Sequence, residues 1–178
     1  MTSEPIYIRR LGYADLPQVI GIERRSFPTP WSLAMFVLEL SKPSGVCLAA
    51  VEQHEDQPAD GDGAQRRRGR DRLLGYLICS RYDEVWHLMN IAIDPVARRR
   101  GLGSRLLNEM LERAGPDAPY TLEVRLSNAP AIALYERYGF RSAGTRPRYY
   151  QDTGEDAMIM WRTTDSQSSA IAGGSTSK

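Results

Sequence analysis

The sequence predicts one domain of mixed α/β architecture, with helices packed on a central sheet. Strand-like apolar stretches and segments with helical apolar spacing follow one another in the order β-α-α-β-β-β-α-β-α-β-β. The length of 178 residues, with 42% hydrophobic and 25% charged residues, suits a single core of substantial size. We therefore expect one domain over residues 1–162.

The N-terminal part is expected to contribute a strand, two helices and a second strand. Residues 6–11 have strand composition, and Asp15 is expected to cap the helix that follows, with Pro17 tolerated in its first turn. Ser32 is expected to cap a second helix through residue 40. A β-rich run over residues 46–51 then forms the next strand.

A polar, arginine-rich segment over residues 53–72 interrupts this pattern. It contains almost no apolar residues, which predicts a solvated, mobile loop between two hairpin strands. Its basic core, residues 66–70, has the charge to contact RNA, but a soluble insertion is the favoured interpretation.

The C-terminal half is expected to form a strand pair, a helix, a strand, a second helix and a closing strand pair. Leucines and a methionine share one face of the first of these helices, and Gly139 ends the second as a left-handed cap. The expected elements are residues 73–80, 85–93, 104–114, 120–124, 129–138, 141–149 and 156–162. The last sixteen residues, 163–178, are rich in Ser, Gly, Thr and Ala, and we expect a disordered tail.

Composition argues against several classes of protein. No apolar run is long enough to span a membrane and residues 1–5 do not resemble a signal peptide, so we expect a cytoplasmic protein that does not bind membranes. The net charge of +1 argues against a domain that binds nucleic acid as a whole. Cys47 and Cys79 lack metal-ligand spacing, so we expect buried thiols rather than a disulfide, a nucleophile or a metal site. A monomer is the default expectation.

The strongest functional signal lies where an apolar strand meets a glycine-containing turn and a helix. Residues 91–93 are followed by Arg98, Arg99 and Arg100 and then by Gly101 and Gly103. Glycines let the backbone approach an anion, and the first N–H groups of a helix point toward one. We interpret this stretch as a pyrophosphate cradle. The pattern alone leaves an ordinary turn with a solvated basic run as an equal alternative.

This stretch resembles the GNAT superfamily of acetyl-CoA-dependent N-acetyltransferases. Arg98, Gly101 and Gly103 match its pattern of Arg or Gln, two residues, Gly, one residue, and Gly or Ala. Other segments resemble the RimI subfamily, which acetylates the N-terminal alanine of small-subunit ribosomal protein number eighteen. They are residues 122–128, 131–136 and 138–140, together with Phe27 and residues 30–32, 148–150 and 155–157. The resemblance covers residues 6–162 apart from the basic loop.

The resemblance implies a cosubstrate and a set of residue roles. Acetyl-CoA is the only cofactor implied, and transfer would be direct, within a ternary complex. The strand backbone at Ile91, Ala92 and Ile93 would bind the pantetheine arm and thioester. The residues implied to hold the rest of the cofactor are Arg99, Arg100, Gly101, Leu102, Gly103, Ser104 and Asn128. Glu123 would be the general base and Tyr135 the general acid.

Each catalytic assignment has a structural alternative. Glu123 would instead pair with an arginine such as Arg125. Tyr135 lies in an apolar helical stripe that is ordinarily part of a core, where its hydroxyl would only find a hydrogen-bond partner.

Substrate choice is less constrained by the sequence. Trp31, Tyr149 and Tyr150 are candidates for lining a peptide groove, although packing explains each of them at least as well. We expect the N-terminal alanine of the ribosomal protein as substrate. The alternatives are a superfamily enzyme acting on lysine or small-molecule amines, and a non-catalytic acetyl-CoA-binding module that docks on ribosomes or RNA through residues 66–70.

Overall fold

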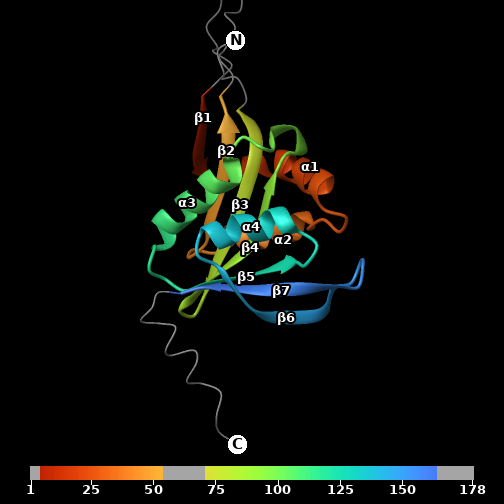
Figure 1. Ribbon diagram of the computed structural model, residues 1–178. Coiled ribbons are helices and arrows are strands. Elements are labelled where there is room, and N and C mark those ends of the chain that lie inside the picture. Colours follow the sequence, from red (N-terminus) through yellow and green to blue (C-terminus); the bar gives the residue numbers. More distant parts are fainter. Residues whose placement is uncertain (1–4, 54–70, 164–178) are drawn as a thin grey trace, which may run out of the picture.

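The computed structural model describes residues 5–53 and 71–163, which form one seven-stranded sheet between two helical layers (Figure 1). The strand order is β1-β2-β3-β4-β5-β7-β6. The strands are β1 (Ile6–Arg10), β2 (Val46–Glu52), β3 (Arg72–Tyr82), β4 (Val85–Ile93), β5 (Tyr120–Arg125), β6 (Arg141–Tyr150) and β7 (Glu155–Arg162). The helices are α1 (Leu16–Ser26), α2 (Leu33–Ser41), α3 (Leu102–Ala114) and α4 (Ala129–Arg137), with 3-10 turns η1 (Tyr13–Asp15) and η2 (Pro95–Ala97).

The mixed α/β class and the order of elements are confirmed. Ser32 caps α2 as predicted, because its hydroxyl accepts the N–H of Met35 at 3.4 Å. Gly139 has the predicted left-handed backbone, with φ of 85°. The basic-loop prediction for residues 53–72 falls largely on residues 54–70, outside the described part, although Arg72 belongs to β3. The predicted tail, apart from its first residue, also lies outside the described residues.

The prediction that Asp15 caps α1 is wrong. Asp15 has helical backbone angles and makes no side-chain capping bond to α1. Its carboxylate instead accepts the N–H of Gly12 at 2.8 Å and both terminal nitrogens of Arg9, at 2.7 and 2.8 Å. Helix capping needs an extended residue at this position, and Asp15 closes the preceding 3-10 turn.

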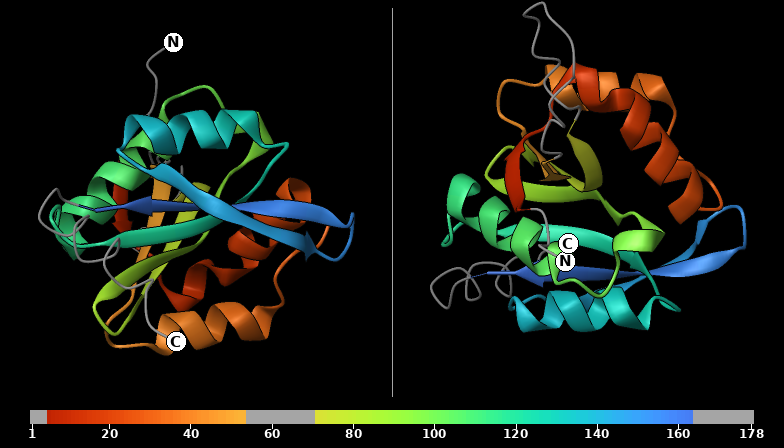
Figure 2. Two further views of the ribbon diagram at one scale, coloured as in Figure 1. Left: turned by 60° about the horizontal axis from the view of Figure 1, so that its bottom comes forward. Right: turned by 90° about the horizontal axis from the view of Figure 1, so that it is seen from above.

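Alternation along β2 divides the core between the two faces of the sheet. Cys47, Ala49 and Val51 pack with α1 and α2, whereas Leu48 and Ala50 pack with α3 and α4. Figure 2 shows α1 and α2 on one side of the strands and α3 and α4 on the other. None of the helices in residues 5–53 and 71–163 combines the length and apolar character that crossing a bilayer requires.

Both cysteines are free and buried, as predicted. Cys47 faces the α1–α2 side, and Cys79 faces the α3–α4 side. Burial raises the pKa of the Cys47 thiol to about 11, and it raises the pKa of Cys79 as well. Both thiols are therefore protonated at neutral pH and poorly suited to nucleophilic catalysis.

The sheet opens between the neighbouring strands β4 and β5. Within the described residues, β4 and the parallel strand β5 pair only at Trp86 with Tyr120 and at His87 with Thr121. Beyond these pairs the strands separate, and in Figure 1 strands β1 to β4 run steeply while β5, β7 and β6 run across. We call this separation the β4–β5 opening. It exposes one edge of β4 where the functional motif begins.

Candidate active site

The last three residues of β4 present free backbone to the β4–β5 opening. Ile91, Ala92 and Ile93 pair with β3 on one edge, opposite Leu77, Tyr76 and Gly75. The other edge lies beyond the last pair with β5. Backbone groups on an unpaired edge are ready to bond an extended ligand. The structure thus gives the predicted pantetheine-binding segment the geometry that such a role needs.

Gly75 in β3 lets β4 approach closely at this point. A Cβ at Gly75 would lie 2.8 Å from the carbonyl oxygen of Ala92 and 3.3 Å from the Cα of Ile93. Sequence reasoning missed this residue. The available signal was a single glycine inside an otherwise apolar strand, which indicates close backbone approach.

Asp94 ends β4 and leads into the glycine-containing turn. Its buried carboxylate accepts the N–H of Val96 at 3.3 Å and forms an ion pair of 2.7 Å with Arg25 of α1. Helix α3 then begins after Gly101, whose φ of 72° is in the left-handed region. The first helical hydrogen bond runs from the N–H of Arg105 to the carbonyl of Gly101 at 3.1 Å.

The start of α3 therefore has the geometry of an anion-binding site. The N–H groups of Leu102, Gly103 and Ser104 precede the first helical hydrogen bond and point out of the helix end. We call residues 98–104 the phosphate loop. Gly101 and Gly103 carry no side chain, and Leu102 turns into the core, so that the backbone of the loop can contact a pyrophosphate.

Helix α4 packs against the phosphate loop. A Cβ at Gly103 would lie 3.1 Å from a methyl group of Leu134, and the hydroxyl of Tyr138 donates to the carbonyl of Ser104 at 2.9 Å. At the start of α4, the side-chain oxygen of Asn128 accepts the N–H of Ala131 at 3.3 Å. Asn128 thus has a capping role, and its predicted contact with the cofactor stays a prediction.

The three arginines of the phosphate loop differ in their contacts. Arg100 forms a 2.9 Å ion pair with Glu52 of β2, and Arg98 donates to the carbonyl of Ile93 at 3.3 Å. Arg99 is exposed, has a left-handed φ of 67°, and is in no ion pair among residues 5–53 and 71–163. Arg99 and Arg100 are the two arginines predicted to hold pyrophosphate. Within the described residues, Arg100 is already in an ion pair and Arg99 is not.

On the far side of the opening, Glu123 is presented by β5. Tyr120, Leu122 and Val124 face the α3–α4 core, so the alternate residues Glu123 and Arg125 face the α1–α2 side. The Glu123 side chain is 25% exposed and lies 3.5 Å from Arg146 of β6.

The alternative that Glu123 pairs with an arginine is confirmed, with Arg146 as the partner instead of Arg125. Arg125 bonds both carboxylate oxygens of Asp152, at 2.9 and 2.7 Å, and also contacts Glu155 at 3.3 Å. Arg125 is thus held by two acids, and Glu123 pairs with Arg146. The sequence offered no signal for Arg146, which lies more than twenty residues away on another strand.

Three further titratable side chains lie within electrostatic range of Glu123. Burial lowers the pKa of His87 on β4, while the charge of Glu123 opposes that shift. Burial and then the charge of Glu123 raise the pKa of Tyr149, and burial is the main cause that raises the pKa of Tyr150 to about 12. All three are therefore uncharged at neutral pH. Both predicted groove tyrosines thus lie within electrostatic range of the proposed base, and lining of a groove by them stays a prediction.

Tyr135 lies on the opposite face, in the α3–α4 core. Its ring packs 5.9 Å from that of Phe140, so the core-packing interpretation is confirmed. Burial, followed by the charge of Tyr150, raises the pKa of Tyr135. Tyr150 thus lies within electrostatic reach of both Glu123 and Tyr135. The role of Tyr135 as general acid stays a prediction.

Trp31 is held by packing in the segment between α1 and α2. Its ring lies 5.3 Å from Phe36, and its backbone N–H donates to the buried carboxylate of Glu23 at 2.8 Å. The segment between α1 and α2 also reaches the β6–β7 turn, where Thr29 hydrogen-bonds Asp152. The segments that carry Trp31 and the two tyrosines therefore meet, although lining of a groove by Trp31 stays a prediction.

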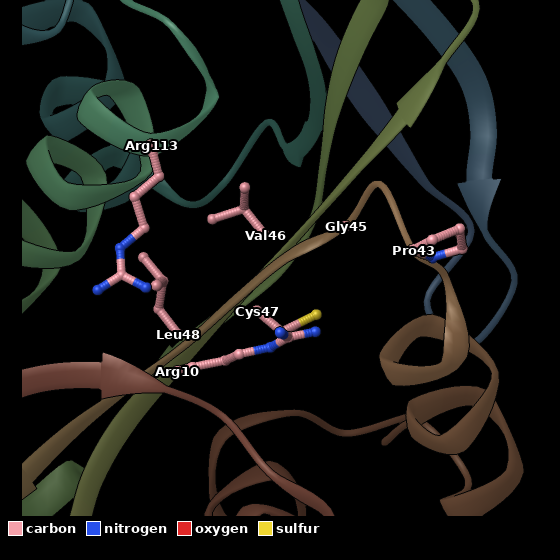
Figure 3. Close-up of a pocket in the computed structure, with 7 residues that line it drawn as sticks. All are labelled: Arg10, Pro43, Gly45, Val46, Cys47, Leu48 and Arg113. Atoms are coloured by element: carbon pink, nitrogen blue, oxygen red, sulfur yellow. The ribbon is translucent and has the colours of Figure 1, made fainter.

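A separate surface pocket of about 160 Å³ lies elsewhere (Figure 3). It is lined by Arg10, Pro43, Gly45, Val46, Cys47, Leu48 and Arg113. Arg113 lies roughly 14 Å along α3 from the end of the phosphate loop, at about 1.5 Å per residue. The pocket contains none of the predicted site residues.

Comparison with known proteins identifies the family. The profile of the acetyltransferase (GNAT) family matches residues 16–140. An uncharacterized protein of Mycobacterium leprae is 37% identical over 166 residues, which cover 90% of this chain but only 41% of that longer protein. A putative ribosomal protein bS18-alanine N-acetyltransferase of Bacillus subtilis is 34% identical over 164 residues, covering 88% of this chain and 94% of the relative.

A solved structure shows the same architecture. The crystal structure of the ribosomal-protein-S18-alanine N-acetyltransferase from Escherichia coli aligns with a TM-score of 0.71 and 30% identity, covering 98% of this chain and 100% of that one. The family match includes β4, the phosphate loop, β5 and α4, the elements that form the site described above. The chain therefore belongs to the acetyltransferase (GNAT) family and is an N-acetyltransferase that uses acetyl-CoA as its cosubstrate.

Proposed function

We propose that this protein acetylates the α-amine of the N-terminal alanine of ribosomal protein bS18, by direct transfer from acetyl-CoA. The observation that carries the proposal is the β4–β5 opening. The free edge of β4, which leads into the phosphate loop, borders it on one side, and β5, which carries Glu123, borders it on the other. The names of the Bacillus subtilis and Escherichia coli relatives support this substrate. We further propose a monomer acting in the cytoplasm, where ribosomal proteins are made.

The proposed reaction assigns one task to each part of the site. The amine nitrogen attacks the thioester carbonyl carbon, a C–N bond forms, and the C–S bond to coenzyme A breaks. Glu123 accepts the proton that the amine loses, and Tyr135 donates a proton to the departing sulfur. Backbone N–H groups at residues 91–93 stabilise the oxyanion. Most of the acceleration comes from holding amine and thioester in contact.

The demand on the acid and the base is modest. A peptide α-amine titrates near about 8, so roughly a tenth of it is already neutral at pH 7. A thiol titrates near about 8.5, so the thiolate is a tolerable leaving group. Burial raises the pKa of Tyr135, which makes it a weak acid that helps mainly by a positioned hydrogen bond.

The competing functions receive less support. Lysine or small-molecule amines would enter the same opening, but the relatives of 34% and 30% identity that cover most of this chain carry names for protein N-terminal alanine acetylation. A non-catalytic module has no need for a carboxylate placed at the opening. The RNA contact proposed for residues 66–70 falls outside the described residues.

The direct test is mass spectrometry of a peptide bearing the bS18 N-terminus after incubation with acetyl-CoA and the protein. We expect one acetyl group on the α-amine, and a rate at least about 100-fold lower for Glu123→Gln. Glu136→Gln, an exposed glutamate on α4, is the matched control and should retain wild-type activity. An Nα-acetylated peptide with one lysine should react far more slowly.

Three results would contradict the proposal. Faster acetylation of the lysine peptide would assign the enzyme to side-chain amines. Acetyl-CoA binding without transfer to either peptide would favour the non-catalytic module. Full activity of Glu123→Gln would remove Glu123 as the base.

A further inference from the structure

The Glu123–Arg146 ion pair links two strands that are not neighbours. Across β7, Arg146 stands in register with Ala157 and then Arg125, on the face of the sheet that carries Glu123. The small side chain of Ala157 leaves room for Arg146 to reach back toward β5. The guanidinium then lies 3.5 Å from one carboxylate oxygen of Glu123.

Arg146 is the ion-pair partner of Glu123 among the described residues. Arg125 on the same strand is held by two acids, Asp152 and Glu155, a separate cluster with one surplus negative charge. His87 from β4 and the two tyrosines of β6 are uncharged at neutral pH, given the directions of their pKa shifts. The facing residue of β7 is the apolar Ile159. Apart from that cluster, the charges next to Glu123 in the described part of the chain are its own carboxylate and the guanidinium of Arg146.

An incoming amine would meet this neutral pair. One oxygen of Glu123 contacts Arg146, and the other is left to accept an N–H from the substrate. Two donors on opposite oxygens of one carboxylate lie within roughly 6 Å of each other, close enough for their charges to interact. Arg146 therefore offsets part of the attraction that Glu123 exerts on a positive ammonium, although solvent screens its half-exposed guanidinium.

We propose that Arg146 neutralises Glu123 so that the site takes the uncharged form of the substrate amine. This inference rests on the proposed function and deepens it, because it supplies a physical basis for preferring α-amines. At pH 7 about a tenth of a peptide α-amine is neutral, against about 0.04% of a lysine amine. A site that accepts only neutral amines therefore favours the α-amine by a few hundredfold before any contact with the peptide.

The test compares Arg146→Gln with the wild type across pH 6 to 9. An unmatched carboxylate stabilises ammonium, so the variant should raise the pKa of the bound α-amine. The acidic limb of the single-turnover rate, measured at saturating peptide and acetyl-CoA, should therefore move up by about one pH unit. The acidic limb of kcat/KM reports the free peptide and should stay where it is.

Peptide binding with coenzyme A present gives a second readout that needs no turnover. For the wild type, affinity for the free α-amine should rise with pH as the neutral form accumulates. For Arg146→Gln, affinity at pH 6 should increase about tenfold because the ammonium form now binds. The Nα-acetylated lysine peptide, which stays charged, should bind the variant more tightly by a similar factor.

Arg148→Gln is the matched control. Arg148 is exposed on the same strand and is in no ion pair among the described residues. This variant should leave both pH profiles unchanged. Acetyl-CoA affinity of all three proteins should be equal, which shows that the fold is intact.

The outcomes separate the inference from the proposed function. A rate that falls equally at every pH, with unchanged binding profiles, would make Arg146 a structural residue and overturn the inference. Wild-type protein that binds peptides with the expected pH dependence but transfers no acetyl group would overturn the proposed function alone. Equal affinity of both proteins for the lysine peptide would also overturn the inference.

Discussion

The two halves of the site are built from different parts of the chain. The proposed acetyl-CoA half is one continuous stretch, the end of β4 with the phosphate loop, and it acts through backbone groups. The proposed amine half is assembled from side chains on β4, β5 and β6, namely His87, Glu123, Arg146, Tyr149 and Tyr150. Adding side-chain atoms in the first half should therefore weaken acetyl-CoA binding. Removing side-chain atoms from the second half should slow acetyl transfer.

The largest expected effect of removing one atom is at Tyr135, where the two halves meet. Tyr135→Phe should lower the single-turnover rate about 100-fold, at the lower end of general acid catalysis, because the departing thiolate is already stable. Acetyl-CoA affinity should be unchanged. Stopped-flow or quenched-flow acetylation with saturating peptide measures the rate, and equilibrium titration measures the affinity.

Tyr120→Phe is the matched control for Tyr135. Tyr120 is a buried tyrosine of the same core, and its hydroxyl donates to the carbonyl of Gly115 at 2.6 Å, at the far end of α3. Its loss should lower stability by about 1 kcal/mol and leave the transfer rate alone. Equal rates for Tyr135→Phe and wild type would reduce Tyr135 to a packing residue.

A smaller effect, confined to the backbone half, is expected at Gly75. Gly75→Ala places a methyl group 2.8 Å from the carbonyl oxygen of Ala92, so β4 must shift at the segment proposed to bind the thioester arm. Such overpacking costs about 1–3 kcal/mol, and we expect acetyl-CoA to bind about tenfold more weakly. Calorimetric titration measures this affinity.

Gly21→Ala provides the comparison for Gly75. Gly21 lies within α1, where an added methyl would lie 3.3 Å from the Nη1 atom of Arg25, whose Nη2 atom pairs with Asp94. Alanine favours a helix over glycine by about 1 kcal/mol, so this variant should keep its acetyl-CoA affinity and its melting temperature or gain stability. An unaltered affinity in Gly75→Ala would show that the close approach of β3 and β4 does not shape the site.

The difference between the halves also explains what the sequence could predict. The acetyl-CoA half was readable because glycines, a strand end and a helix start are local signals, and Gly101 and α3 lie where they were expected. The residue roles of Glu123 and Tyr135 came from the family resemblance. Arg146 was not predictable, because its meeting with Glu123 depends on the register of three strands.

Rules based on residue type and on strand alternation also gave wrong predictions where tertiary contacts determine the conformation. Asp15 has the residue type of a helix cap, but Arg9 and Gly12 hold its carboxylate. Met89 forms a bulge in β4, between residues that pair with Cys79 and Ile78. The bulge places Asn90 toward Glu23 of α1, although simple alternation would turn it to the other face.

The smallest expected effect distinguishes two neighbouring arginines of the phosphate loop. Arg99 is exposed and in no ion pair among the described residues, whereas Arg100 is already paired with Glu52 at 2.9 Å. Arg99→Gln should therefore weaken acetyl-CoA binding by up to about fivefold, the range of an exposed charge pair, and Arg100→Gln should weaken it less. The difference should shrink as salt rises from about 0.05 to 0.5 M, because exposed charges are screened. Equal losses at all salt concentrations would mean that Arg100 leaves Glu52 to bind the cosubstrate, and that the ion pair in the free protein does not predict its role.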